Sequence, residues 1–105
     1  MSSDRLFEVT TKLGRRVRVS RVYWEYVVGV KHPSMRGLEG FVKGALTEPI
    51  EVRRSTRDPA VHLFYGKFDE RLRCCVVVKF LNGDGFVITA YLTGRMVGDS
   101  IWKKR

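Results

Sequence analysis

The feature that most constrains the fold is an apolar stretch from Cys74 to Arg95 that is interrupted by one turn sequence. Val, Ile, Phe and Tyr dominate on both sides of Asn82-Gly83-Asp84-Gly85, a composition typical of two antiparallel strands joined by a tight turn. Three polar side chains, Lys79, Thr89 and Tyr91, stand where valine would fit. Because successive side chains of a strand point to opposite faces, the hairpin predicts a sheet with one face reserved for function.

The length of the turn decides whether Lys79 shares that face with Thr89. A three-residue loop over residues 83–85 places Lys79 opposite Thr89 and Val77 opposite Tyr91, whereas an even loop puts Lys79 on the other side. The sequence leaves both open. We favour the three-residue loop, since an even loop would bury a lysine among apolar residues at a free-energy cost. The three-residue loop also places the apolar side chains on one face, which comprises Val76, Val78, Phe80, Phe86, Ile88 and Ala90.

The length and the net charge of the chain limit the functions that it can have. A chain of 105 residues has room for one domain, expected over residues 1–105 with a core from about residue 6 to residue 102. The 20 Lys and Arg against 11 Asp and Glu leave a formal net charge of +9, while 44% hydrophobic residues indicate a folded globule. This combination is typical of nucleic-acid binding, with an acidic protein partner or an anionic membrane surface as competing explanations.

The sequence also carries expectations about location and cofactors. No apolar run approaches the ~20 residues of a membrane span and the first residues show no apolar signal region, so we expect a soluble, cytoplasmic protein without membrane contact. The side chains of the adjacent Cys74 and Cys75 point to opposite faces of a strand, which predicts free thiols. Two histidines and two cysteines form no zinc pattern, and we expect neither a metal nor another cofactor.

Patterns in the first half of the chain predict two strands and two helices. Residues 6–10 and 16–20 alternate in polarity, as an N-terminal strand pair does. A first helix is expected from an N-cap at Ser20 to about Lys31, before His32-Pro33 breaks it, and a second from about Ser34 to Leu46.

Patterns in the second half predict an antiparallel meander. Four strands with short connections are expected at residues 50–54, 61–68, 72–81 and 85–92. In the segment 93–105, Ile101 and Trp102 are expected to dock on the body of the domain. The predicted fold class is therefore α+β, with an N-terminal strand pair, two helices and a four-stranded antiparallel meander sheet.

Several short motifs carry a family resemblance, and they are His32-Pro33, Glu48-Pro49, Arg53-Arg54-Ser55, Phe64-Tyr65, Val76-Val77-Val78-Lys79 and Phe86-Val87-Ile88-Thr89-Ala90-Tyr91. In this order, over about Phe7 to Trp102, the chain resembles phage and prokaryotic members of the barnase–EndoU–colicin–RelE-like nuclease superfamily. The resemblance implies a RelE/barnase-like fold with a metal-independent ribonuclease site on an open sheet face, as in toxins of toxin–antitoxin pairs and phage-associated RNases. The chain departs from the better-known acid–base members because its last two strands contain no Glu.

Metal-free cleavage of RNA uses the 2′-OH as nucleophile and needs a proton-transfer group and cations for the phosphorane charge. We expect His32 to transfer the proton, since histidine changes charge near neutral pH. Arg54 and Lys79 are expected to stabilise the phosphorane charge. Thr89 and Tyr91 would position phosphate or base.

Three further residues, Arg53, Tyr65 and Arg73, are expected to bind RNA through charge and stacking. Ordinary structural roles compete with these assignments. His32 would cap a helix, and the two adjacent arginines would protect an edge strand, with only one of them facing the cleft. For His62, packing across strands is the favoured interpretation.

The leading hypothesis is a metal-independent endoribonuclease, a toxin or a phage-associated RNase, with RNA as substrate and an acidic antitoxin as protein partner. The alternative is a non-catalytic module that binds RNA or an acidic protein through the same face. A structural phage or mobile-element protein whose charge is incidental remains a third class.

Overall fold

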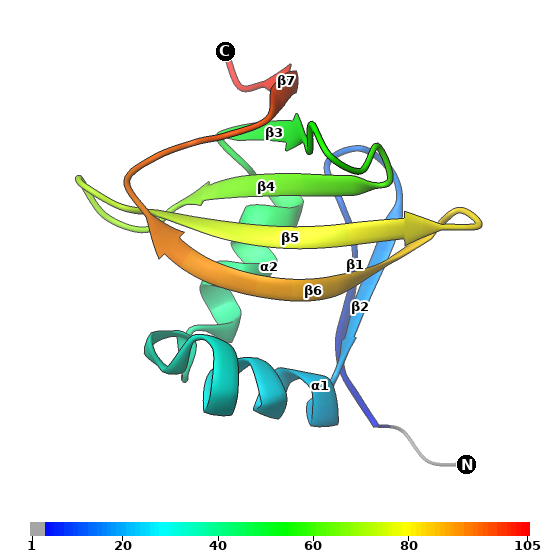
Figure 1. Ribbon diagram of the computed structural model, residues 1–105, viewed down its shortest axis with the longest axis vertical. Helices are drawn as coiled ribbons and strands as arrows, with labels where there is room; N and C mark the ends of the chain where they lie inside the picture. The colour runs from blue at the N-terminus through cyan, green and yellow to red at the C-terminus, as the bar shows by residue number, and fades with distance from the viewer. Residues whose placement is uncertain (1–3) are drawn as a thin grey trace.

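The computed structural model describes residues 4–105, and within them seven strands form one mixed sheet (Figure 1). The strands are β1 (Arg5–Thr10), β2 (Arg16–Ser20), β3 (Glu51–Arg54), β4 (Val61–Lys67), β5 (Arg73–Leu81), β6 (Asp84–Thr93) and β7 (Asp99–Lys103). Their order across the sheet is β1-β2-β6-β5-β4-β3-β7. The helical elements are α1 (Arg21–Tyr26), the π-helical turn η1 (Val27–Lys31), the 3-10 turn η2 (Pro33–Met35) and α2 (Glu39–Thr47). No helix of this part of the chain is long and apolar enough to cross a membrane.

The predicted four-stranded antiparallel meander was wrong. β3, β4, β5 and β6 do pair successively in antiparallel fashion, but further strands extend both edges. The N-terminal pair joins the same sheet through a parallel contact of β2 with β6, at Val17–Gly85 and Arg18–Phe86, and β7 pairs antiparallel with β3. The physical reason is that both edges of a meander expose unpaired backbone groups, which these added strands satisfy.

The predicted second helix, from Ser34 to Leu46, is interrupted. η2 forms first, Gly37 then adopts a φ of +84°, and α2 begins only at Glu39. A positive φ suits glycine and ends a helical turn, so the apolar periodicity there spans two elements. The first helix begins as predicted, because the Ser20 hydroxyl caps it by accepting a hydrogen bond from the Tyr23 amide at 3.0 Å.

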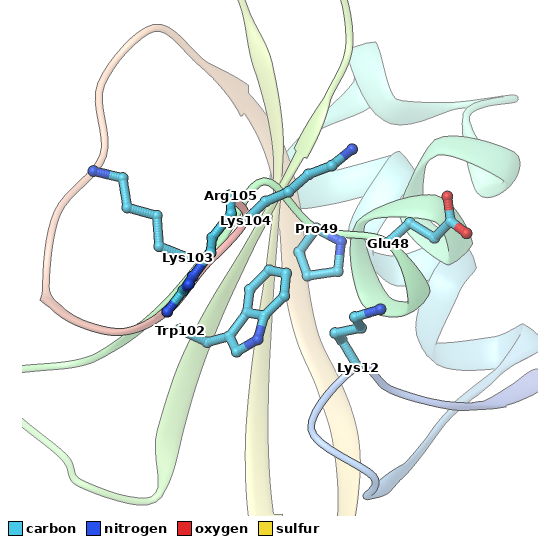
Figure 2. A pocket seen from close by; sticks show the side chains of 7 residues that line it. All are labelled: Lys12, Glu48, Pro49, Trp102, Lys103, Lys104 and Arg105. Carbon is cyan, nitrogen blue, oxygen red and sulfur yellow. The ribbon is translucent and has the colours of Figure 1, made fainter.

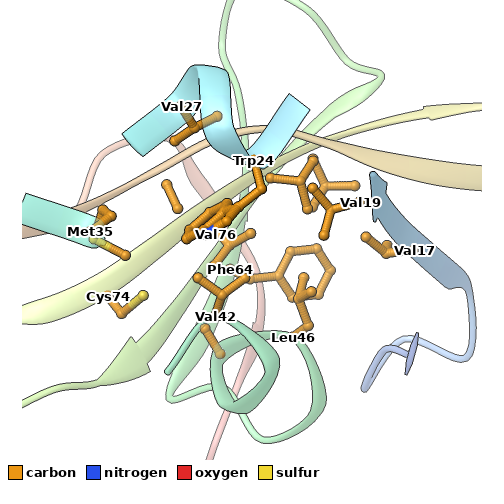
Figure 3. Packing of buried hydrophobic residues seen from close by; sticks show 14 of the residues in the cluster. Val17, Val19, Trp24, Val27, Met35, Val42, Leu46, Phe64, Cys74 and Val76 are labelled. Atoms are coloured by element: carbon orange, nitrogen blue, oxygen red, sulfur yellow. The ribbon is translucent and has the colours of Figure 1, made fainter. Parts of the chain in front are cut away.

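The helices cover one face of the sheet and build the main core there (Figures 1 and 3). Trp24 of α1 and Val42 and Leu46 of α2 pack with Phe64 and Val76 of the central strands. The core further includes Phe7, Val17, Val19, Val27, Val28, Met35, Ala45, Val52, Cys74, Val78, Phe80, Val87 and Ala90. Cys74 and Cys75 are buried free thiols, as the sequence predicted.

The hairpin turn has two residues and not three. Leu81 pairs with Asp84 across Asn82 and Gly83, which adopt positive φ angles of 54° and 89°. Primed turns of this kind match the twist of a hairpin. Lys79 therefore lies opposite Phe86 and not opposite Thr89.

A β-bulge in β6 nevertheless places Thr89 and Tyr91 on the same face as Lys79, as the predicted register would have done. Val78 pairs with Val87 but Val77 pairs with Thr89, which leaves Ile88 unpaired. The extra residue shifts the alternation of β6, so Thr89 and Tyr91 point to the same face as Lys79. The predicted apolar set is wrong at Phe86, which is 42% exposed on the other face.

Candidate nucleic-acid interface

The sheet face opposite α1 and α2, here called the second face, carries most of the predicted site residues. Residues that pair directly across neighbouring strands point to the same side. The register places on this face Glu51, Arg53, Val61, Leu63, Tyr65, Lys67, Arg73, Cys75, Val77, Lys79, Phe86, Thr89, Tyr91 and Thr93.

A strap, defined as residues 94–98, crosses part of the second face from β6 to β7 at the opposite edge (Figure 1). Met96 packs on a small cluster of Leu63, Tyr65 and Cys75. The Tyr65 hydroxyl accepts a hydrogen bond from the Val97 amide at 3.0 Å. Tyr65 has 0% exposed surface, so in this arrangement it offers no ring face for stacking.

Arg53 also holds the strap. One terminal guanidinium nitrogen donates to the Met96 carbonyl at 3.1 Å, and Nε donates to the Glu51 carboxylate at 2.9 Å. Burial by itself raises the pKa of Glu51, but hydrogen bonds from Ser100 and Arg53 and the charge of Arg53 outweigh it and lower the pKa. Arg53 is therefore engaged in a buried structural network.

Lys79 is neutralised by a neighbouring carboxylate. Its ammonium lies 3.1 Å from Asp58, and the two side chains are 36% and 42% exposed. The backbone hydrogen bond from Ala60, followed by the hydrogen bond from Lys79, lowers the pKa of Asp58. A phosphate at this position would have to compete with Asp58.

Arg54 lies on the helix-covered side of the sheet and is separated from the other predicted catalytic residues. It pairs across the strands with His62, whose imidazole packs edge-on against Phe80 at a centroid distance of 5.0 Å. Burial chiefly lowers the pKa of His62, and the charges of Arg54 and Arg15 act in the same direction. His62 is thus a packing residue, as favoured from the sequence.

Tyr91 belongs to a buried polar group on the second face. Its hydroxyl and that of Tyr65 both hydrogen-bond the Cys75 thiol. Burial raises the pKa of Cys75 to about 11 and also raises that of Tyr91, so both groups stay protonated at neutral pH. The Thr89 hydroxyl oxygen is buried and finds no hydrogen-bond partner among residues 4–105.

His32 contacts Tyr91. The ring centroids are 5.5 Å apart, and the planes are tilted by 36°. His32 follows η1, whose last residue Lys31 donates to the Ile88 carbonyl at 3.2 Å and so fixes this turn against β6. The structure therefore brings His32 to Tyr91, but Lys79 lies four residues along β5 from Cys75, the partner of Tyr91, a separation of about 13 Å at the ordinary rise of a strand.

A cationic row, defined as Lys67 and Arg73, lies beside this contact at the same end of the second face. Lys67 pairs directly with Arg73, which pairs in turn with Thr93, two residues beyond Tyr91. Neither cation forms an ion pair within residues 4–105. Lys67 was missed from the sequence, although it lies as far before the Asp69-Glu70-Arg71 turn as Arg73 lies after it, which could have indicated the pairing.

Among residues 4–105, no three His, Cys, Asp or Glu side chains gather closely enough to hold a metal ion. The candidate interface is thus made of cations, a histidine and aromatic or hydroxyl side chains. Comparisons of the chain with protein-family models, with curated proteins and with solved structures found no match.

Proposed function

We propose that the protein binds single-stranded RNA through the cationic row and Tyr91. The observation that carries the proposal is the direct cross-strand pairing of Lys67 with Arg73, for which residues 4–105 supply no carboxylate partner. Like charges directly opposite each other destabilise a sheet. An anion between them removes this repulsion, and phosphate accepts hydrogen bonds from both side chains.

The hydrogen bonding of Arg73 supports the same conclusion. Its Nε is buried and has no acceptor in the described part of the chain, residues 4–105. Buried donors are nearly always paired in folded proteins, so a lone one needs an explanation. Asp69, four residues before Arg73, instead accepts from the Arg71 and Leu72 amides at 2.8 and 2.7 Å and closes the turn.

The neighbours of the row suit a nucleotide chain. The His32 and Tyr91 residues, both partly exposed, lie next to it, and Arg73 lies opposite Thr93, two residues beyond Tyr91. Arg95, exposed and two residues after Thr93, extends the positive charge into the strap. RNA bases stack on rings of this kind while the cations bind the backbone.

Fluorescence anisotropy of a labelled mixed-sequence RNA, measured over a series of salt concentrations, tests the proposal. The Lys67→Gln/Arg73→Gln variant is expected to bind more weakly, with a salt slope reduced by about 0.7 for each lost phosphate contact. Arg5→Gln/Arg16→Gln is the matched control, because it removes the same charge from arginines already paired with Glu8. Equal losses in both variants would show unspecific attraction to the +9 charge.

A second candidate function, metal-independent endoribonuclease activity, is favoured by the contact between His32 and Tyr91. In this proposal His32 transfers the proton and Arg73 stabilises the phosphorane, while Lys79 and Arg54 lie too far away to act in the same step. The relationship to the barnase–EndoU–colicin–RelE-like superfamily is proposed for the RNA chemistry alone, because the sheet differs from the predicted meander.

Incubation of RNA with the protein in excess chelator separates cleavage from binding. Cutting that produces cyclic phosphate ends, and that is lost in His32→Ala but kept in Lys79→Ala, would support the nuclease. Intact RNA together with salt-sensitive binding would support a protein that binds RNA without cleaving it. If an acidic protein binds the cationic row and RNA does not, the proposed ligand changes from RNA to an antitoxin-like acidic protein, the alternative partner predicted from the sequence.

A further inference from the structure

A pocket of about 410 Å³ lies on the helix-covered side of the sheet, away from the cationic row. It is lined by Lys12, Glu48, Pro49, Trp102, Lys103, Lys104 and Arg105 (Figure 2). These residues come from the β1–β2 turn, from the link between α2 and β3, and from the end of β7. Its volume falls in the range of small-molecule sites in proteins.

Backbone hydrogen bonds hold the three segments together. The Lys12 amide donates to the Leu46 carbonyl at 3.0 Å, and the Lys104 amide donates to the Ile50 carbonyl at 2.9 Å. Trp102 pairs with Val52 of β3 and packs partly against the main core. The pocket is therefore formed by the fold itself, before any ligand is present.

The lining combines aromatic surface with positive charge. In Figure 2 the Trp102 indole and the Pro49 ring lie at the centre, Lys12 lies beside the indole, Lys104 extends past the Pro49 ring on the other side, and Lys103 points away. The Lys12 ammonium is 5.9 Å from the centroid of the Trp102 ring, at the outer limit of a cation–π contact. None of the four lining cations forms an ion pair within residues 4–105.

We propose that this pocket binds a nucleotide, with the base stacked on the Trp102 indole and the phosphate held by Lys12 and Lys104. An indole face next to unpaired ammonium groups matches the two parts of a nucleotide, a planar ring and an anion. The one acidic side chain of the lining, Glu48, points away from Trp102 in Figure 2, whereas four of the lining side chains are cationic. The site goes beyond RNA binding by the second face and does not depend on it.

The ligand could be a free nucleotide or the phosphorylated end of an RNA chain, since both present the same base and phosphate. Tryptophan fluorescence reports on the site, because Trp24 is 2% exposed and Trp102 is the accessible indole. Titration with AMP is expected to give saturable quenching. Binding of a 5′-phosphorylated tetranucleotide that is tighter than AMP identifies the RNA end as the ligand, and binding that is equal to or weaker than AMP identifies the free nucleotide.

Variants distinguish the pocket from unspecific attraction. Lys12→Gln is expected to weaken AMP binding by about tenfold, the loss of one charge-assisted hydrogen bond. Lys43→Gln is the matched control, because its ammonium lies 5.2 Å above the Phe7 ring and outside the pocket. Trp102→Leu, followed by calorimetry, is expected to abolish AMP binding, and Lys12→Gln keeps the proposal testable if that variant does not fold.

Three results would overturn the proposal: absence of saturable quenching, equal weakening in Lys12→Gln and Lys43→Gln, or inorganic phosphate binding as tightly as AMP. The last result would mean that the base makes no contact. Loss of RNA binding in the Lys67→Gln/Arg73→Gln variant with unchanged AMP quenching would separate this pocket from the second face.

Discussion

The Tyr23 hydroxyl donates a hydrogen bond of 2.5 Å to the carbonyl of Ile88, the unpaired residue of the β6 bulge. The Lys31 ammonium donates to the same carbonyl at 3.2 Å and to the Tyr23 hydroxyl at 3.1 Å. A bulge leaves a carbonyl outside the regular ladder, and such a group needs a partner. The first helix therefore stabilises the bulge that brings Thr89 and Tyr91 to the second face.

Tyr23→Phe removes one of the two donors to the Ile88 carbonyl. We expect a loss of about 0.5–1.5 kcal/mol in the free energy of unfolding, measured by chemical denaturation, because Lys31 keeps the carbonyl partly satisfied. Tyr26→Phe is the control, since Tyr26 is 46% exposed and only its ring contacts Tyr23. Equal effects of the two variants would argue against a role of the Tyr23 hydroxyl.

Gly66 permits close packing of α2 on β4. A Cβ at this position would lie 2.6 Å from the Ala45 Cα. Gly66→Ala is expected to destabilise the protein by about 1–3 kcal/mol, because overpacking must displace the helix backbone. Gly44→Ala, on the open side of the same helix, is expected to stabilise by about 0.5–1 kcal/mol. Thermal unfolding of both variants should show shifts of opposite sign.

The strap depends on Gly98 for a different reason. Gly98 and Gly83 have nearly the same φ, +92° and +89°, but a Cβ at Gly98 would lie 2.7 Å from the Arg54 carbonyl, whereas the space around Gly83 is open. Both alanine variants are expected to lose about 1–2 kcal/mol in the free energy of unfolding, because alanine disfavours the left-handed backbone conformation. Gly98→Ala should cost more than Gly83→Ala in denaturant titrations, because it also displaces the strap. Equal costs would contradict the close approach.

Stability should fall as the pH decreases below the ordinary pKa of histidine. The folded state lowers the pKa of His62 from 6.5, chiefly through burial, so below pH 6.5 the unfolded chain takes up a proton that the folded chain does not. Above pH 6.5 the imidazole is neutral in both states and contributes nothing. We expect the decline to begin near pH 6.5 and to continue until His62 protonates in the folded protein.

Denaturation midpoints between pH 8 and about pH 5, above the range of ordinary carboxyl titration, test this dependence. His62→Leu should flatten the curve in this window, since it removes the group whose pKa changes on folding. His32→Leu, which keeps His62, should retain the slope. A slope that survives in His62→Leu would assign the dependence to other groups.

Only part of the candidate site could be predicted from the sequence. Lys79, Thr89 and Tyr91 share a face as predicted, but through a two-residue turn and a bulge instead of the predicted loop. Neither the bulge nor the Asp58 partner of Lys79 has a sequence signal, because both depend on residues that meet only in the folded sheet. Lys67 became part of the site through its direct pairing with Arg73, which its spacing from the Asp69-Glu70-Arg71 turn could have indicated.

The amino-acid pattern by itself determined where most strands lie, the Ser20 cap and the basic character of the surface, because alternation, capping and net charge are local or additive properties. The tertiary structure decided which strands are neighbours. β2 pairs with β6 and β7 pairs with β3, because the edges of the central sheet would otherwise expose unpaired backbone N–H and C=O groups. No local sequence pattern indicates which segment pairs with such an edge. The register of β3 on β4 placed Arg54 on the helix-covered face, and the register of β4 on β5 placed Lys67 beside Arg73.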